Sequence, residues 1–447
     1  MIMFSDIEKE NDDKTNEEDH GKHSSPFDEI RKQLNEILGP SGSKLGFAFP
    51  AVNVSKVDSQ KSKEDEDKQT KSFIRKIKKF NMKPREIRDY LDRFVIKQSE
   101  AKKVLAVAIC DHYNHVRKCL CNKKAYDEEY NKQNVLLIGP TGVGKTYLIK
   151  NVAKLIGVPF AKVDATKFSE TGYVGSDVED MVRDLVKAAD GNIEIAQYGI
   201  IFIDEIDKIA TASGPDGRDI SGRGVQINLL KLMEESEVVA YSQSDMMSQL
   251  RAAVSFAGSG KEKKQSINTK HILFVASGAF DKLSDIVKTR VGGKSIGFNF
   301  SVSEDEQRDI YEYLKKVSTA DLIKYGFEPE FVGRLPVRVA CESLNAEDLK
   351  NILVSSEGSI LKQYMDDFGG YDITLNVEDD ALSEIAKLAS EEKTGARGLL
   401  TILEKVFRDF KFELPSTDIK SFQIRKDDVS NPKGALDKLL KNVAQAQ

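Results

Sequence analysis

Long apolar runs are missing from this chain of 447 residues, and none approaches the roughly 20 residues that a membrane-spanning helix needs. Its first twenty residues are rich in acidic side chains and contain no apolar core, so they resemble neither a secretory signal nor a transit peptide. Four cysteines are too few for a disulfide framework in a chain of this length and are typical of a reducing compartment. These absences predict a cytoplasmic protein without a membrane partner.

Metal-ligand spacings and an excess of basic charge are missing as well. Only one residue separates Cys119 from Cys121, and no second cysteine pair or spaced histidine pair accompanies them, so we expect no zinc site. His112 and His115 lie three apart on a predicted helix, where a surface or capping role is expected. The formal net charge of −5 provides no general affinity for nucleic acid, which argues against a nucleic-acid partner.

The strongest motif present is a glycine-rich loop, Gly139-Pro140-Thr141-Gly142-Val143-Gly144-Lys145-Thr146. It follows an apolar run at 135–138 that predicts a buried strand, and it opens into a predicted helix at 145–155. In that context the glycines let backbone N–H groups point at phosphates, at the positive end of the helix. Lys145 adds a cation, and the Thr146 hydroxyl is placed to bind Mg²⁺. The loop predicts binding of ATP with Mg²⁺.

A second motif supplies carboxylates. The apolar run 200–203 predicts a strand, and Asp204 and Glu205 follow it directly. Asp204 is placed to bind Mg²⁺ through water, and Glu205 to orient and deprotonate the attacking water. A strand that simply ends in solvated acids is the alternative. With the phosphate loop upstream, the two motifs together predict hydrolysis of ATP rather than binding alone.

Strands and helices alternate through the middle of the chain. The predicted strands are residues 135–138, 160–163, 200–203, 272–276 and 337–340. This alternation predicts an α/β fold with a parallel sheet covered by helices on both faces, and phosphate sites in such sheets lie at the carboxyl ends of the strands. After residue 344 the pattern becomes mostly helical and predicts a smaller C-terminal domain.

The composition divides the chain into four segments. Residues 1–82 are predicted to be a largely disordered charged leader, with a charge-mixed run at 56–79 and a short amphipathic helix at 26–38 that packs on its own domain or docks a partner. A large ATPase domain at 83–343, a small domain at 344–430 and a tail at 431–447 follow. Val95 and Ile96 lie in an apolar turn before the phosphate loop, where they fit a cover for an adenine ring or a plain hinge between helices equally well.

Together these motifs resemble the ClpX family, the hexameric ATP-driven protein unfoldases of the Clp/Hsp100 branch of the AAA+ superfamily. The resemblance runs from about residue 84 to about residue 415. Besides the two ATPase motifs, the matching segments are Tyr90–Gln98, Ala101–Leu105, Ala165–Gly175, Ser221–Gln226, Ile296–Phe298, Pro329–Pro336 and Lys393–Leu399. The resemblance implies an AAA+ core, a homo-hexamer and protein substrates drawn through a central pore.

The resemblance also implies roles for residues outside the ATPase motifs. Arg334 matches the arginine finger, which acts on the nucleotide of a neighbouring subunit, and Arg397 matches the sensor-2 arginine of the small domain. Gly172-Tyr173-Val174-Gly175 matches the first pore loop, which grips substrate. Ile296-Gly297-Phe298 matches the loop that docks onto the ClpP peptidase. The chain has no convincing peptidase constellation, so proteolysis would belong to that partner.

Several features depart from the family pattern. The amino-terminal zinc-binding domain is missing, and the acidic leader stands in its place. Lys97 replaces a glycine in the Val-Ile-Gly-Gln turn, and Arg223 replaces the usual glutamate, a charge reversal expected near the pore. Such departures suggest a diverged member with its own substrates. The related unfoldase HslU fits less well, because no large helical insertion precedes the strand at 200–203.

Three other functions are weighed against this interpretation. The first is a stand-alone remodelling chaperone without a peptidase. The second is a nucleic-acid-dependent motor with the same ATPase core. The third is a nucleotide-gated scaffold without turnover.

Overall fold

The computed structural model describes residues 56–126, 128, 130–168, 177–210, 220–240, 266–291, 310–355 and 357–444. Contacts divide the chain into two units, Met1–Lys63 and Glu64–Gln447. The account below concerns the second unit and helix α2, which begins at Lys56. No helix among the described residues is long and apolar enough to cross a membrane.

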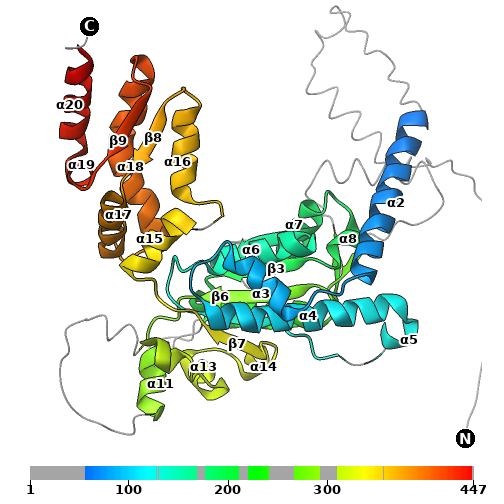
Figure 1. Ribbon diagram of the computed structural model, residues 1–447. Helices are drawn as coiled ribbons and strands as arrows, with labels where there is room; N and C mark the ends of the chain where they lie inside the picture. Colours follow the sequence, from blue (N-terminus) through cyan, green and yellow to red (C-terminus); the bar gives the residue numbers. More distant parts are fainter. Residues whose placement is uncertain are drawn as a thin grey trace, which may run out of the picture. The chain divides into compact units, whose positions relative to one another are not determined.

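A five-stranded sheet forms the centre of the large domain (Figure 1). Its strands are all parallel and run in the order β2-β3-β6-β1-β7. Their bounds are β1 Val135–Ile138, β2 Phe160–Asp164, β3 Ile200–Asp204, β6 Leu273–Gly278 and β7 Val337–Ala340. The predicted α/β fold is confirmed, and each of the five predicted strands is present within two residues at either end.

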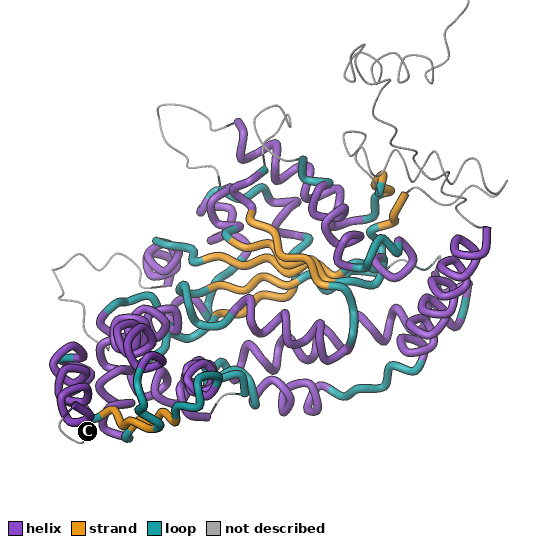
Figure 2. Tube along the Cα trace, turned by 90° about the horizontal axis from the view of Figure 1, so that it is seen from above, coloured by secondary structure: helices purple, strands orange, loops and turns teal. Residues whose placement is uncertain are grey.

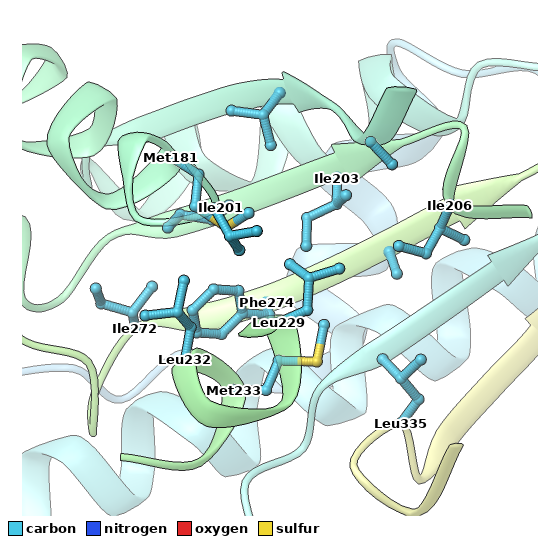
Figure 3. Close-up of a cluster of buried hydrophobic side chains, with 14 of the residues drawn as sticks. Met181, Ile201, Ile203, Ile206, Leu229, Leu232, Met233, Ile272, Phe274 and Leu335 are labelled. Carbon is cyan, nitrogen blue, oxygen red and sulfur yellow. The ribbon is translucent and has the colours of Figure 1, made fainter. Parts of the chain in front are cut away.

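Helices cover both faces of the sheet (Figure 2). Successive side chains of a strand point to opposite faces of the sheet, so neighbouring residues of β3 pack in different cores. Ile201 and Ile203 pack with Phe274 in one core (Figure 3), whereas Ile200 and Phe202 belong to the other. Strands that are apolar on both faces explain the continuous apolar runs in the sequence.

Helices and short elements precede β1 and connect the strands. They are α2 Lys56–Lys78, α3 Pro84–Asp92, α4 Ser99–Cys121, α5 Lys123–Tyr126, α6 Lys145–Ile156, η2 Ala165–Lys167, α7 Asp180–Ala188, α8 Ile193–Ala196, η3 Ile206–Ile209, α9 Ile220–Glu234, α11 Leu283–Val291, α13 Thr319–Tyr325 and α14 Pro329–Gly333. An antiparallel pair, β4 Glu237–Val239 and β5 Ser266–Asn268, was not predicted from the sequence.

The C-terminal domain is small and mostly helical, as predicted. Its elements are α15 Ala346–Ser355, α16 Ile360–Gly369, β8 Thr374–Val377, α17 Asp379–Glu391, α18 Ala396–Glu413, η4 Leu414–Ser416, β9 Ser421–Ile424, α19 Lys426–Ser430 and α20 Pro432–Ala444. Strand β8 pairs in parallel with β9, which the sequence did not predict. Aromatic rings fill the core, where Phe368, Phe407 and Phe410 are buried.

Residues 1–82 were predicted to be a largely disordered leader, but the charged run within it is helical: α2 occupies residues 56–78. The last turns of α2 bury Ile77 fully and pack Phe73 against the large domain, while Asn192 Nδ2 donates to Thr70 Oγ1 at 2.6 Å. A few apolar residues at helical spacing are enough to order a segment whose average composition is polar. The predicted helix at 26–38 lies outside the described residues.

Candidate functional site

The two ATPase motifs meet at one edge of the sheet. Strands β1, β3 and β6 are adjacent, and their carboxyl ends carry the glycine-rich loop, the acidic pair and Ser277. Gly139 N–H donates to the Gly278 carbonyl at 3.2 Å, and Ser277 Oγ donates to Asp204 Oδ1 at 3.1 Å. A main-chain hydrogen bond therefore joins the loop to β6, and a side-chain hydrogen bond joins Asp204 to the same strand.

The loop needs its glycines for conformation and for space. Gly139, Gly142 and Gly144 have φ of 153°, 77° and 95°, a range that side chains strongly disfavour. A Cβ on Gly139 would also come within 2.7 Å of the Cys341 carbonyl oxygen. The loop therefore curls tightly above β1 and leads directly into the amino end of α6, whose unpaired N–H groups favour an anion.

Lys145 is folded back onto the loop. Its Nζ donates to the carbonyl oxygens of Gly139 at 2.5 Å and Pro140 at 2.8 Å, and the side chain is buried. Burial lowers the pKa of Lys145, and nearby Asp204 opposes that effect. A buried ammonium bonded to two neutral carbonyl oxygens can exchange them for the charged oxygens of a phosphate, which form stronger hydrogen bonds.

Asp204 and Glu205 differ sharply in environment. Asp204 is half-buried, and Lys162 Nζ lies 3.0 Å from its Oδ2. Glu205 is exposed and has a left-handed backbone with φ of 56°, so its side chain leaves the alternation of the strand. Thr146 is half-buried at the second residue of α6. Its hydroxyl and the Asp204 carboxylate are the oxygen ligands that Mg²⁺ prefers, so these residues fit that ion.

The small domain reaches the same loop. The Ala396 N–H, at the start of α18, donates to the Gly142 carbonyl at 2.9 Å. A side chain on Gly142 would collide with the carbonyl of Thr394. Arg397 follows directly, is exposed, and lies near enough to contribute to the lowering of the Lys145 pKa. The structure thus brings Arg397 to the phosphate loop of its own subunit.

The apolar turn before α4 lies beside the loop. Val95 is 6% exposed, and a Cβ on Gly144 would lie 3.5 Å from Val95 Cγ1. Ile96 is half-buried. The turn therefore borders the loop at the start of α6, and its position is compatible with both functions considered for it, the adenine cover and the hinge.

Arg334 lies elsewhere. Its carbonyl accepts from Asn134 Nδ2 at 3.0 Å, and Asn134 immediately precedes β1, so Arg334 is at the amino end of the strand whose carboxyl end carries the loop. Four strand residues separate the two places by roughly 13 Å. The Arg334 guanidinium contacts Glu234 of α9, with Nη2 2.5 Å from Oε1. Within one subunit, Arg334 is not brought to the phosphate loop.

Helix α9 braces the segment that carries Arg334. The fully buried Gln226 donates from Nε2 to the Ile209 carbonyl at 2.9 Å and accepts at Oε1 from Glu328 N–H at 2.8 Å. Arg223 Nε lies 3.0 Å from Glu328 Oε1. Helix α9 therefore ties η3, which follows Glu205, to the start of α14. The pattern Ser221–Gln226 was noticed in the sequence, but it gave no role for Gln226.

Two groups of predicted residues lie outside the described part of the chain. They are the pore-loop residues Gly172, Tyr173, Val174 and Gly175, and the docking residues Ile296, Gly297 and Phe298.

Comparisons with known proteins agree with this geometry. Residues 130–338 match the family described as AAA domain (Cdc48 subfamily), and residues 344–415 match the C-terminal, D2-small domain, of ClpB protein. The ATP-dependent Clp protease ATP-binding subunit ClpX of Borrelia duttonii (strain Ly) is 44% identical over 354 residues, which is 78% of each chain. The protein of that name from Treponema denticola is 42% identical over 338 residues, 74% of this chain and 77% of its own.

The chain belongs to the ClpX family. Membership and the AAA domain make it an ATPase, and the loop-and-carboxylate edge described above is its candidate nucleotide site.

Sequence reasoning missed Ser277 and Lys162, whose side chains contact Asp204. Ser277 follows the apolar run of β6 just as Asp204 follows that of β3, so the rule that located Asp204 applies to it too. Lys162 gave no signal in the sequence, because an exposed lysine at an alternate position of a strand is ordinary.

Proposed function

We propose that this ClpX-family ATPase is a protein unfoldase that acts in the cytoplasm as a homo-hexameric ring and threads protein substrates through a central pore. The observation that carries the proposal is the opposite placement of two arginines. Arg397 lies at its own phosphate loop, whereas Arg334 lies at the other end of β1. An arginine finger at that position can complete only a neighbour's site, which calls for a closed ring.

The chemistry follows from the residues at the sheet edge. Lys145 and the loop N–H groups bind the β- and γ-phosphates of ATP, and Thr146 and Asp204 hold Mg²⁺, which would screen the phosphate charge. Glu205 orients the attacking water and accepts its proton as the bond to the γ-phosphorus forms and the bond to ADP breaks. Arg334 of one subunit and Arg397 of the other stabilise the charge on the transferring group.

Movement follows from the two-domain contact. Arg397 belongs to the proposed small domain, 344–430, and the loop to the proposed large domain, 83–343. Loss of the γ-phosphate removes an anion that both arginines contact, so the domains can change their relative angle. Tyr173, between Gly172 and Gly175, would grip the substrate with an aromatic side chain. Ile296 and Phe298 would enter apolar clefts of a ClpP-like peptidase.

The test is degradation of a folded, tagged protein with ATP, with and without ClpP. Wild-type protein with ClpP should degrade it, and Tyr173→Ala should retain ATP turnover but lose unfolding. Unfolding at the wild-type rate by Tyr173→Ala would show that the pore-loop assignment is wrong. Phe298→Ala is the matched control, since it should unfold substrate but no longer sediment with ClpP.

The other candidate functions give different results. A stand-alone remodelling chaperone would unfold the substrate, and no ClpP would sediment with it. ATP turnover stimulated by DNA would favour the nucleic-acid motor, and absence of phosphate release would favour the scaffold.

A further inference from the structure

Lys97 and Gln98 end the turn that connects α3 to α4, and both have a left-handed backbone, with φ of 61° and 58°. Glycine takes this conformation readily, whereas a residue with a Cβ is disfavoured in it. The family pattern has glycine at the position of Lys97. A lysine in this place therefore calls for contacts of its side chain that stabilise the conformation.

The structure shows those contacts. Lys97 Nζ donates to the Ser343 carbonyl at 2.9 Å and to Asp348 Oδ2 at 2.9 Å. The Lys97 side chain is 27% exposed and that of Asp348 is 16% exposed. Because water is largely excluded from this pair, the attraction is screened less than in an ordinary surface ion pair.

Asp348 is a fixed anchor within the small domain. It lies in the first turn of α15, where Asn345 N–H donates to Asp348 Oδ2 at 2.9 Å and Asp348 N–H donates to Asn345 Oδ1 at 2.8 Å. Lys97 thus bonds to a carboxylate that caps the first helix of the small domain, at the end where an acidic group is favoured. The pair links the turn to the small domain as a whole.

Gln98 extends the link to Glu342, just before the proposed boundary between the domains at 343/344. Its Nε2 donates to the Glu342 carbonyl at 2.7 Å, and its Oε1 accepts from the Glu342 N–H at 2.8 Å. On its other side the turn lies beside Gly144 through Val95, because a Cβ on Gly144 would be 3.5 Å from Val95 Cγ1. One short turn therefore lies beside the phosphate loop and bonds to Glu342 and to the first helix of the small domain.

We infer that Lys97 is a positioning residue for ATP binding: its bonds to Asp348 and Ser343 hold the small domain against the turn beside the phosphate loop. The inference rests on the proposed ATP site and adds a determinant of nucleotide affinity that lies outside the phosphate loop and the acidic pair. Without the pair, the turn and the small domain must be ordered by the nucleotide itself, which weakens binding. The catalytic groups are untouched, so turnover at saturating ATP stays the same.

The experiment measures steady-state ATP hydrolysis and the affinity for a fluorescent ADP analogue in the full-length chain. Lys97→Met should raise both the KM for ATP and the Kd for the analogue about 3- to 10-fold, with kcat within about twofold of wild type. Asp348→Asn should change affinity in the same direction but less, since its amide oxygen still accepts from Asn345 and Lys97 while the charge attraction is lost, and the double variant should be no weaker than Lys97→Met. Lys97→Arg should restore wild-type affinity.

Two variants separate the ion pair from other causes. Lys97→Gly removes strain and side chain together, so it should bind as weakly as Lys97→Met; wild-type affinity in Lys97→Gly would overturn the inference. Lys103→Met removes a lysine near the start of α4 that, within the described residues, forms an ion pair only with Glu100, at 3.8 Å, and it should leave KM unchanged. An unchanged KM in Lys97→Met would also overturn the inference.

The failure of the proposed ATP site would look different. If Glu205→Gln left ATP turnover intact, the catalytic assignment would be wrong, whatever the Lys97 variants did. Binding of the ADP analogue does not depend on turnover, so the Kd of the Lys97 variants tests the role of Lys97 independently of the catalytic assignment.

Discussion

Replacing Arg334 by alanine should abolish ATP turnover and leave the fold almost unchanged. The Arg334 and Glu234 side chains are 47% and 42% exposed, and exposed ion pairs contribute about 0–1 kcal/mol to stability. The bond from Asn134 ends on the backbone carbonyl of Arg334 and survives the substitution. By contrast, loss of an arginine finger lowers the rate about 10³- to 10⁵-fold, which corresponds to roughly 4–7 kcal/mol of transition-state stabilisation.

Mixing two inactive variants tests whether Arg334 acts on a neighbour. Arg334→Ala keeps the proposed base Glu205, and Glu205→Gln keeps the proposed finger Arg334. If equal amounts assemble at random into rings, about one quarter of the sites combine an intact Glu205 with an intact neighbouring Arg334, so turnover should return to at most that fraction of wild type. If Arg334 served its own subunit, no site would contain both groups.

The assay is phosphate release at saturating ATP, with the thermal midpoint of each variant recorded. Arg408→Ala is the matched control, because Arg408 is 67% exposed and, within the described part of the chain, pairs only with Glu404, at 3.0 Å on the same helix. It should turn over ATP like wild type. An inactive mixture, or an Arg334→Ala variant within tenfold of the wild-type rate, would refute the assignment.

Two further predictions concern stability. Burial lowers the pKa of His112 to about 3 and that of His271 to about 4, below the value of about 6.5 in the unfolded chain. The folded state therefore binds fewer protons than the unfolded state, and the stability present above pH 6.5 should fall as the pH drops toward 4. The fall should be smaller in His112→Gln. Urea midpoints measured across this pH range check this, and an equal change of midpoint with pH in the variant and wild type would contradict it. Phe407→Ala should destabilise the small domain by about 3–5 kcal/mol, because its ring is fully buried among other aromatic rings; a denaturation midpoint like that of wild type would show that the core collapses around the cavity.

His112 also shows where reasoning from spacing fails. Its position three residues before His115 on an apparently amphipathic helix was interpreted as a surface or capping place. In the structure His112 is 1% exposed, and its Nε2 is 3.1 Å from the His271 carbonyl. The contact joins residues 159 positions apart, so no local pattern could predict it. Histidine occurs both on surfaces and in cores, and only the fold decides which environment His112 has.

The sheet edge, in contrast, was largely predictable. Apolar runs mark the strands, and the rule that phosphate sites lie at the carboxyl ends of parallel strands brings the glycine-rich loop and Asp204 together. The register of β3 on β6 then places Ser277 beside Asp204, which the sequence alone does not give. The approach of Ala396 to Gly142 depends on how the small domain folds back, which no periodicity encodes; only the resemblance, through Arg397, led us to expect the small domain at the loop.

The departures from the family pattern acquire a physical reason within the chain. Arg223 was interpreted as a charge reversal near the pore, and with Lys97 it suggested a member with its own substrates. The structure pairs Arg223 with Glu328 at 3.0 Å and Lys97 with Asp348 at 2.9 Å. Each new positive charge therefore has an internal carboxylate partner on another element. Because both charges have partners within the chain, the two departures can be explained by internal contacts alone, without a change in what the protein binds.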